Sequence, residues 1–199
     1  MVFGWNLVPM PAVPAAPASI EYLAVDTVAL ATSVFTGQQQ TQDWQAGWME
    51  WTVTMPAMPH ALAQAWIAWL LGLRGIAGVF QIGDPLAAQP QGTGAGAPIV
   101  VGSGQTGVLL NTTGWVGAGA LLPGDYLQIG YRLYRCLSTV NNGAQTLSIW
   151  PQIRESPPDG TAIVVFNTQG LFRLKGNPRK WSVSDNRTYG IQFDVREAI

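Results

Sequence analysis

The sequence predicts a mainly β protein with one central amphipathic helix. Three observations support this fold class. Several segments alternate β-branched or aromatic residues with polar ones, turn signals rich in Gly, Asn, Asp and Pro separate them, and a single segment has apolar residues at helical spacing. Hydrophobic residues make up 48% of the 199 positions, which is enough for a sizeable core.

The composition excludes several functional classes. Only 11% of the residues are charged and the formal net charge is -1, so general DNA binding is not expected. One Cys and one His exclude a disulfide framework, Cys-rich zinc sites and multi-His metal sites, and we expect neither a metal nor a cofactor. Nine Trp among so few charges indicate exposed apolar surface, which usually marks subunit or partner contacts.

The N-terminal part of the chain divides into an arm and a β region. Residues 1–19 are rich in Pro and Ala, and we expect them to form an extended arm. They contain no Lys or Arg and so lack the basic region of a signal peptide, which predicts an intracellular product. Residues 20–56 are expected to be β, because Trp51 and Val53 alternate with Thr52 and Thr54.

A helix is expected over residues 59–74. Pro59 suits the first turn, Gly75 can end the helix, and Arg74 would place a cation near the negative end of the helix dipole. The apolar residues of this segment form one stripe, and we assign them to the core: Leu62, Trp66, Trp69, Leu70 and Leu73. The apolar stretch is too short to span a bilayer, so no membrane partner is expected.

The composition changes at Leu86. From there to Gly124 the chain is rich in Gly and Ala and carries no charge before Asp125. Four strand-like segments separated by turn signals follow, so a second small β module begins here. The last stretch is β again, with Ile191 and Phe193 on the face that would enter a core.

No motif demands catalysis. The glycines of GSGQTG match a dinucleotide-binding pattern, but the residues that follow are poor helix formers, so we expect turns at Gly102, Gly104 and Gly107. Cys136 is expected to be a buried hydrophobe and His60 a surface residue at the helix start, rather than a catalytic pair.

Two rival functions remain open at this stage. The Trp content fits a carbohydrate-binding or host-attachment module, with Trp115, Trp150 or Tyr126 as stacking platforms. A cell-wall hydrolase would use Asp84 or Asp125, although both follow Gly in tight turns, where Asp commonly bonds its own backbone.

Charge is segregated along the chain. Residues 1–73 contain four acids and no Lys or Arg, whereas residues 160–199 contain six cations and three acids. The simpler interpretation is pairing inside one domain, and the alternative is a head-to-tail contact between subunits. For that contact the candidate interface residues are Trp44, Trp48, Arg173, Arg179 and Arg187.

Several segments taken in order resemble the distal tail protein, or a related minor tail-tip protein, of long-tailed bacteriophages (siphophages) and prophages. The resemblance covers about residues 35–175. It rests on the Gln38–Gln40 loop followed by Trp44, Gly47 and Trp48, and on AWIAWLLGLRG, VFQIGDP, GSGQTG, LLPGDYLQIGYRLYRCL, IWPQIR and GLFRL. Its most specific parts are LRGIAGVFQIGDP and the PGDYLQIG, LYR and IWPQIR series.

The resemblance implies a structural virion protein rather than an enzyme. Such proteins form hexameric rings that join the tail tube to the tip or hub complex. A β-sandwich-like ring domain would comprise residues 20–85 and 166–199, with a small β-barrel-like module, residues 86–165, inserted into it. The implied partners are further copies of the chain, the tail tube protein, the tail hub or tip protein and, as a further candidate, tail fibres. DNA would pass through the lumen without specific binding, and the protein would be made in the host bacterial cytoplasm.

Overall fold

The computed structural model describes residues 5–13 and 16–199. The fold is mainly β, with 47% strand and 10% helix, and α1 (His60–Gly72) is the one α-helix of the described residues, which confirms the predicted fold class. The chain divides into two compact units. The first unit combines Met1–Leu23, Met49–Pro85 and Gln169–Ile199, and the second combines Ala24–Trp48 and Leu86–Thr168.

These units differ from the expected domains at several boundaries, and residues 166–168, expected in the ring domain, group with the second unit. The expected inserted module, residues 86–165, lies in the second unit. The segment Ala24–Trp48, expected in the ring domain, also groups with the second unit. Residues 28–32 and 39–43 of this segment form a two-stranded sheet of their own.

The first unit is built on one eight-stranded sheet. The strands follow the order β1 (Asn6–Leu7), β7 (Gly78–Ile82), β14 (Gly170–Leu174), β16 (Thr188–Glu197), β5 (Trp48–Thr54) and β2 (Ser19–Val25). The two other strands, β6 (Met58–Pro59) and β15 (Trp181–Val183), pair with the first half of β16. Within the expected extended N-terminal segment, residues 1–19, β1 joins the sheet in parallel with β7. Residues 1–4 and 14–15 lie outside the described residues.

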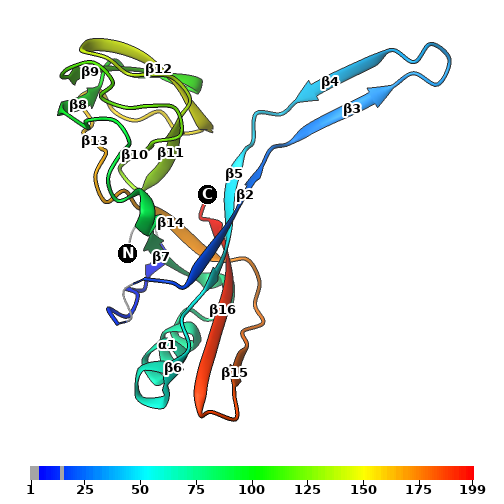
Figure 1. Ribbon diagram of the computed structural model, residues 1–199. Coiled ribbons are helices and arrows are strands. Elements are labelled where there is room, and N and C mark those ends of the chain that lie inside the picture. Colours follow the sequence, from blue (N-terminus) through cyan, green and yellow to red (C-terminus); the bar gives the residue numbers. More distant parts are fainter. Residues whose placement is uncertain (1–4, 14–15) are drawn as a thin grey trace. The chain divides into compact units, whose positions relative to one another are not determined.

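Helix α1 covers one face of this sheet (Figure 1). Phe193 of β16 lies 6.3 Å from the ring of Trp66 and 5.4 Å from that of Trp69, measured between ring centroids. Trp69 also meets Phe80 of β7 edge to face at 4.9 Å. The two layers of the expected sandwich-like domain are therefore a sheet and a helix, joined by an aromatic cluster.

Four of the five helix residues assigned to the core are buried, namely Trp66, Trp69, Leu70 and Leu73. Leu62 is the exception, because 37% of its surface stays exposed. In the first turn of α1 the buried residue is Ala63, and Leu62 is left on the flank. The helix also ends before Arg74, which has a left-handed φ of 52° and begins the turn into η1 (Gly75–Ala77).

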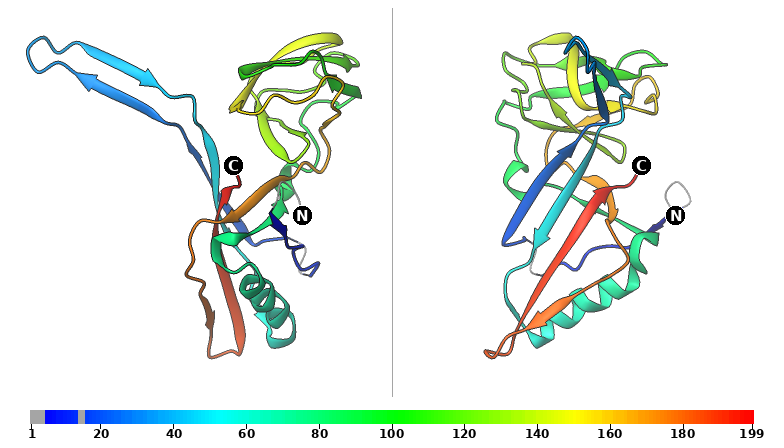
Figure 2. Two further views of the ribbon diagram at one scale, coloured as in Figure 1. Left: turned by 180° about the vertical axis from the view of Figure 1, so that it is seen from behind. Right: turned by 90° about the vertical axis from the view of Figure 1, so that its right-hand side faces the viewer.

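The second unit contains a six-stranded, nearly closed barrel (Figure 2). Its strands follow the order β13 (Ile163–Val164), β10 (Tyr126–Ile129), β11 (Arg132–Cys136), β12 (Gly143–Ile153), β9 (Gly107–Trp115) and β8 (Gly96–Val100). A bridge between Ile99 and Ala162 brings the first strand back to the last. A short 3-10 turn, η2 (Pro85–Ala87), opens the segment that leads into this barrel. Its interior is filled by apolar side chains, among them Leu110, Leu127, Leu147 and Ile149.

The same unit contains a separate two-stranded sheet. Strands β3 (Val28–Thr32) and β4 (Gln39–Asp43) pair only with each other, in an antiparallel register that runs from Val28 opposite Asp43 to Thr32 opposite Gln39. Both figures draw them as one long hairpin (Figure 1).

The packing of α1 yields a stability prediction. Trp66→Ala and Leu70→Ala should each lower the free energy of unfolding by about 2–5 kcal/mol, because each empties a filled site in the core. Leu62→Ala is the matched control on the same helix and should cost less than about 1 kcal/mol, since Leu62 is partly exposed. Calorimetric melting measures all three, and equal melting of Trp66→Ala and wild type would contradict this packing.

Candidate functional site

The hairpin of residues 27–44, which we call the arm, is the most exposed element of the described chain. All five residues of β4 are exposed, and so are four of the five in β3. A two-stranded hairpin without a packed face is marginally stable in water by itself. The arm therefore has the properties of an element that is completed by a contact with another surface.

The arm carries large apolar side chains in that exposed position. Val28 and Leu30 share one face of the hairpin with Thr41. At the tip, Val34 and Phe35 are 90% and 95% exposed. The tip turn is organised by Ser33, whose Oγ accepts hydrogen bonds from the N–H groups of Phe35 (3.4 Å) and Thr36 (3.3 Å). Between Asp26 and Asp43 the arm has no charged residue, so its exposed apolar side chains lie among uncharged polar ones.

The base of the arm is fastened within its own unit. The indole Nε1 of Trp150 donates a hydrogen bond of 2.8 Å to the Asp26 carboxylate, and the guanidinium of Arg154 donates to the Gly47 carbonyl. A Cβ at Gly47 would lie 2.8 Å from Asp26 Oδ1 and 3.0 Å from Trp150 Nε1, so a larger residue would displace this hydrogen-bonded pair. The predicted interface residue Trp44 is 61% exposed at the same base, whereas Trp48 is half-buried at the start of β5.

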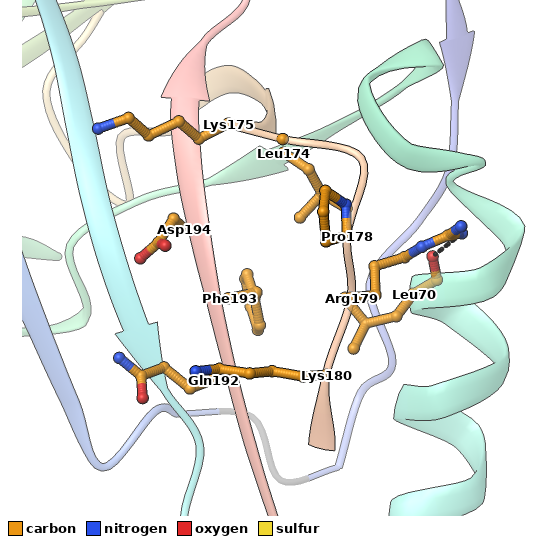
Figure 3. Close-up of a pocket in the computed structure, with 10 residues that line it drawn as sticks. Leu70, Leu174, Lys175, Pro178, Arg179, Lys180, Gln192, Phe193 and Asp194 are labelled. Carbon is orange, nitrogen blue, oxygen red and sulfur yellow. Dashed lines mark hydrogen bonds between the residues drawn. The ribbon is translucent and has the colours of Figure 1, made fainter.

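A pocket of about 350 Å³ lies in the first unit between the end of α1 and β16, and we call it the α1–β16 pocket. Leu70, Leu174 and Phe193 supply its apolar part, and Lys175, Arg179 and Lys180 surround it (Figure 3). Arg179 Nη1 donates to the carbonyls of Leu70 (3.3 Å) and Leu71 (3.4 Å), so it is the cation at the C-terminal end of the helix dipole in place of the expected Arg74.

The segregated charges are partly paired inside the first unit. Glu50 lies 2.6 Å from the ammonium of Lys175 and 3.9 Å from the guanidinium of Arg196. Of the predicted interface cations, Arg173 lies 5.0 Å from the ring centroid of Trp5, and Arg187 is exposed in the turn before β16. Internal pairing therefore accounts for part of the pattern that the sequence presents.

Asp125, the candidate acid of a hydrolase, holds backbone groups of the barrel loops by hydrogen bonds. It is buried, and its carboxylate accepts hydrogen bonds from the backbone N–H groups of Gln91 (2.7 Å), Leu122 (2.8 Å) and Gly92 (3.1 Å). Three such bonds tie two loops of the barrel together and occupy the oxygens that catalysis would need.

The other catalytic candidates also lie in structural surroundings. Cys136 is buried in the barrel and its thiol donates to the Ser138 carbonyl at 3.0 Å. Burial raises the pKa of this thiol, which disfavours the nucleophilic thiolate. His60 belongs to the other unit, where its Nδ1 lies 2.9 Å from the Tyr189 hydroxyl.

Two of the three predicted sugar platforms are wrong. Trp115 is buried, with its indole N–H donating to Thr112 Oγ1 at 2.7 Å, and Tyr126 is buried beneath the guanidinium of Arg135. Trp115 belongs to the barrel core and Tyr126 is covered by Arg135, so neither ring is open to stack on a ligand. Only Trp150 keeps partial exposure, and its indole N–H is bonded to Asp26.

The glycine motif forms turns as predicted. Gly102, Gly104 and Gly107 all have positive φ, and the strand β9 follows them rather than a helix. The Gln105 side chain bridges this turn, accepting from the Asn111 N–H at 2.6 Å and donating to the Val101 carbonyl at 2.8 Å.

A metal-ion cluster and a membrane-spanning helix are both absent from the described residues. They contain no group of three or more His, Cys, Asp or Glu side chains placed to hold a metal ion. Across residues 5–13 and 16–199, no helix is both long and apolar enough to cross a membrane. A scan against protein-family models and a search of curated proteins find no match to this chain.

The role of Asp125 leads to a second prediction. Asp125→Ala should destabilise the barrel by about 2 kcal/mol, because three backbone N–H groups lose the buried carboxylate that accepts their hydrogen bonds. Hydrogen exchange at Gln91, Gly92 and Leu122 should accelerate. Asp159→Ala is the control, since Asp159 accepts a bond from Gly102 on an exposed loop and its loss should be nearly neutral.

The environment of Cys136 leads to a third prediction. At about pH 8 a thiol reagent should modify the folded protein at least about tenfold more slowly than the urea-unfolded chain, because burial both shields the thiol and raises its pKa. Equal rates would mean that the barrel core is open at this position.

Proposed function

We propose that this chain is a structural subunit of a ring at the distal end of a phage tail, where it joins the tail tube to the tip or hub complex. The observation that carries the proposal is the arm, a hairpin with uncharged, exposed apolar residues and no packed face of its own. Such an element suits assembly, since covering Val34, Phe35 and Leu30 removes apolar surface from water.

The environments of the catalytic candidates favour assembly over turnover. Asp125 holds loops together and Cys136 lies in the barrel core. The sugar-binding alternative loses Trp115 and Tyr126 as platforms, because both rings are buried. A structural role at the tail tip is thus the function that best accounts for the exposed arm and for the segments that carry the resemblance.

The proposed location is the virion, at the tail tip, after synthesis in the host cytoplasm. The proposed partners are further copies of the chain, the tail tube protein, the hub or tip protein and tail fibres. With 10 Lys and Arg in the whole chain, a ring would offer DNA few phosphate contacts, which suits passage through a lumen.

A shortened arm tests this proposal. The wild type should form a closed oligomer of about six copies, measured by light scattering over a concentration series. In the variant, residues 28–43 are replaced by Asn-Gly, a turn that can join Thr27 to Trp44 because the Trp44 N–H already bonds the Thr27 carbonyl at 3.1 Å. We expect unchanged melting of both units and loss of the oligomer.

A control with a full-length arm tests whether assembly depends on the apolar face of the arm. Gln40→Ala and Gln42→Ala alter the face opposite Val28 and Leu30, and these variants should assemble like the wild type. A shortened variant that keeps the wild-type mass would contradict the role assigned to the arm.

A further inference from the structure

We infer that the arm of one copy docks at the α1–β16 pocket of a second copy, with Phe35 as the side chain that enters it. This inference rests on the proposed function, because it names the contact through which copies would join. It connects the most exposed apolar tip of the described chain to a preformed pocket with an apolar floor.

The volume and the apolar lining of the pocket suit the side chain of Phe35. A cavity of about 150 Å³ is enough to hold benzene. A pocket of about 350 Å³ therefore accepts the phenyl ring of Phe35 and leaves room for Val34 beside it. The floor is formed by Leu70, Leu174 and Phe193, so an entering ring would exchange water for apolar and aromatic contacts.

The polar rim does not require a charged occupant. Lys175 is paired with Glu50, and Arg179 is bonded to the last carbonyls of α1. Asp194, which also lines the pocket, accepts a hydrogen bond of 2.7 Å from Thr52 Oγ1. An uncharged turn fits such a rim, because its backbone carbonyls can accept hydrogen bonds from the exposed Lys180.

The charges of the two surfaces are complementary. Residues 24–48, which include the arm, carry Asp26 and Asp43 and no cation. The segment 175–180 at the pocket carries three cations, and Asp194 with Glu50 offsets only part of that charge. An acidic element approaching a basic rim is steered toward it, and this complementarity disfavours the docking of two arms on each other.

An open sheet edge adjoins the pocket. Strand β15 begins at Trp181, directly after Lys180, and all three of its residues are exposed. Within the described chain β15 pairs with β16 along one edge and with no strand along the other. The arm has open edges as well, so one of its strands can add to β15 while the tip fills the pocket. Because tip and pocket are different surfaces, the contact is heterologous and can propagate around a ring.

Cysteine cross-linking between two differently marked copies tests the contact. Full-length Thr36→Cys protein, which keeps Phe35 and has its cysteine on the exposed tip next to that ring, is mixed with full-length Lys180→Cys protein and treated with a short bismaleimide. The native Cys136 is buried, and wild-type protein carried through the same treatment reports its background. We expect a cross-linked dimer that forms only in the mixture.

The matched control places the second cysteine on an exposed helix position of the same unit, Ala65→Cys. Thr36→Cys mixed with Ala65→Cys should give at most about a tenth of the dimer. As a second test, Phe35→Ala should weaken self-association at least about tenfold, whereas Phe35→Leu should retain most of it.

The outcomes separate this contact from the proposed function. If the wild type forms a closed oligomer but the Lys180 mixture cross-links no better than the Ala65 mixture, the pocket is not the docking site and the ring proposal stands. If the chain stays monomeric at every concentration, a second copy is not the occupant of the pocket, and this inference is overturned.

Discussion

The first unit depends on its C-terminal strand. Strand β16 pairs with β5 and β14 through its second half and with β6 and β15 through its first half, so four strands meet on it. Its Phe193 also packs between Trp66 and Trp69 of α1. Strands from separate segments of the chain are therefore held together by β16, which also supplies Gln192, Phe193 and Asp194 to the α1–β16 pocket.

The second unit combines a packed barrel with an arm that has no packed face. The barrel closes around an apolar interior, and buried polar groups such as Asp125 hold its loops by hydrogen bonds to backbone. The arm has cross-strand hydrogen bonds but no interior, and its base is fastened by Asp26 to Trp150 and by Arg154 to Gly47. Its apolar side chains thus have contacts to gain only from another surface.

Patterns that are local in sequence were enough to predict part of this structure. The stripe Trp66, Trp69, Leu70 and Leu73 predicted a helix with a buried face, and the composition change at Leu86 marked the start of the barrel segment. Leu62 was predicted wrongly because helical spacing defines a face but not how far along the helix that face is covered.

Contacts between distant segments could not be predicted in this way. That Arg179 bonds the end of α1, or that Lys175 meets Glu50, depends on strand pairing that no local pattern encodes. Composition could not tell a stacking platform from a core ring, so Trp115 and Tyr126 were assigned to a surface that they do not reach. The arm did leave a signal, since the run from Gln38 to Asp43 has no apolar alternation and hence no core face.

Hydrogen exchange along the arm tests the central claim most directly. The amides of residues 28–43 would be followed in the wild-type protein at concentrations below and above the onset of self-association. The account predicts weak protection in the dilute chain, where the hairpin lacks a packed face, and strong protection once a second copy covers it. Equal protection at both concentrations, while the mass of the particle increases, would contradict the claim that the arm is the assembly element.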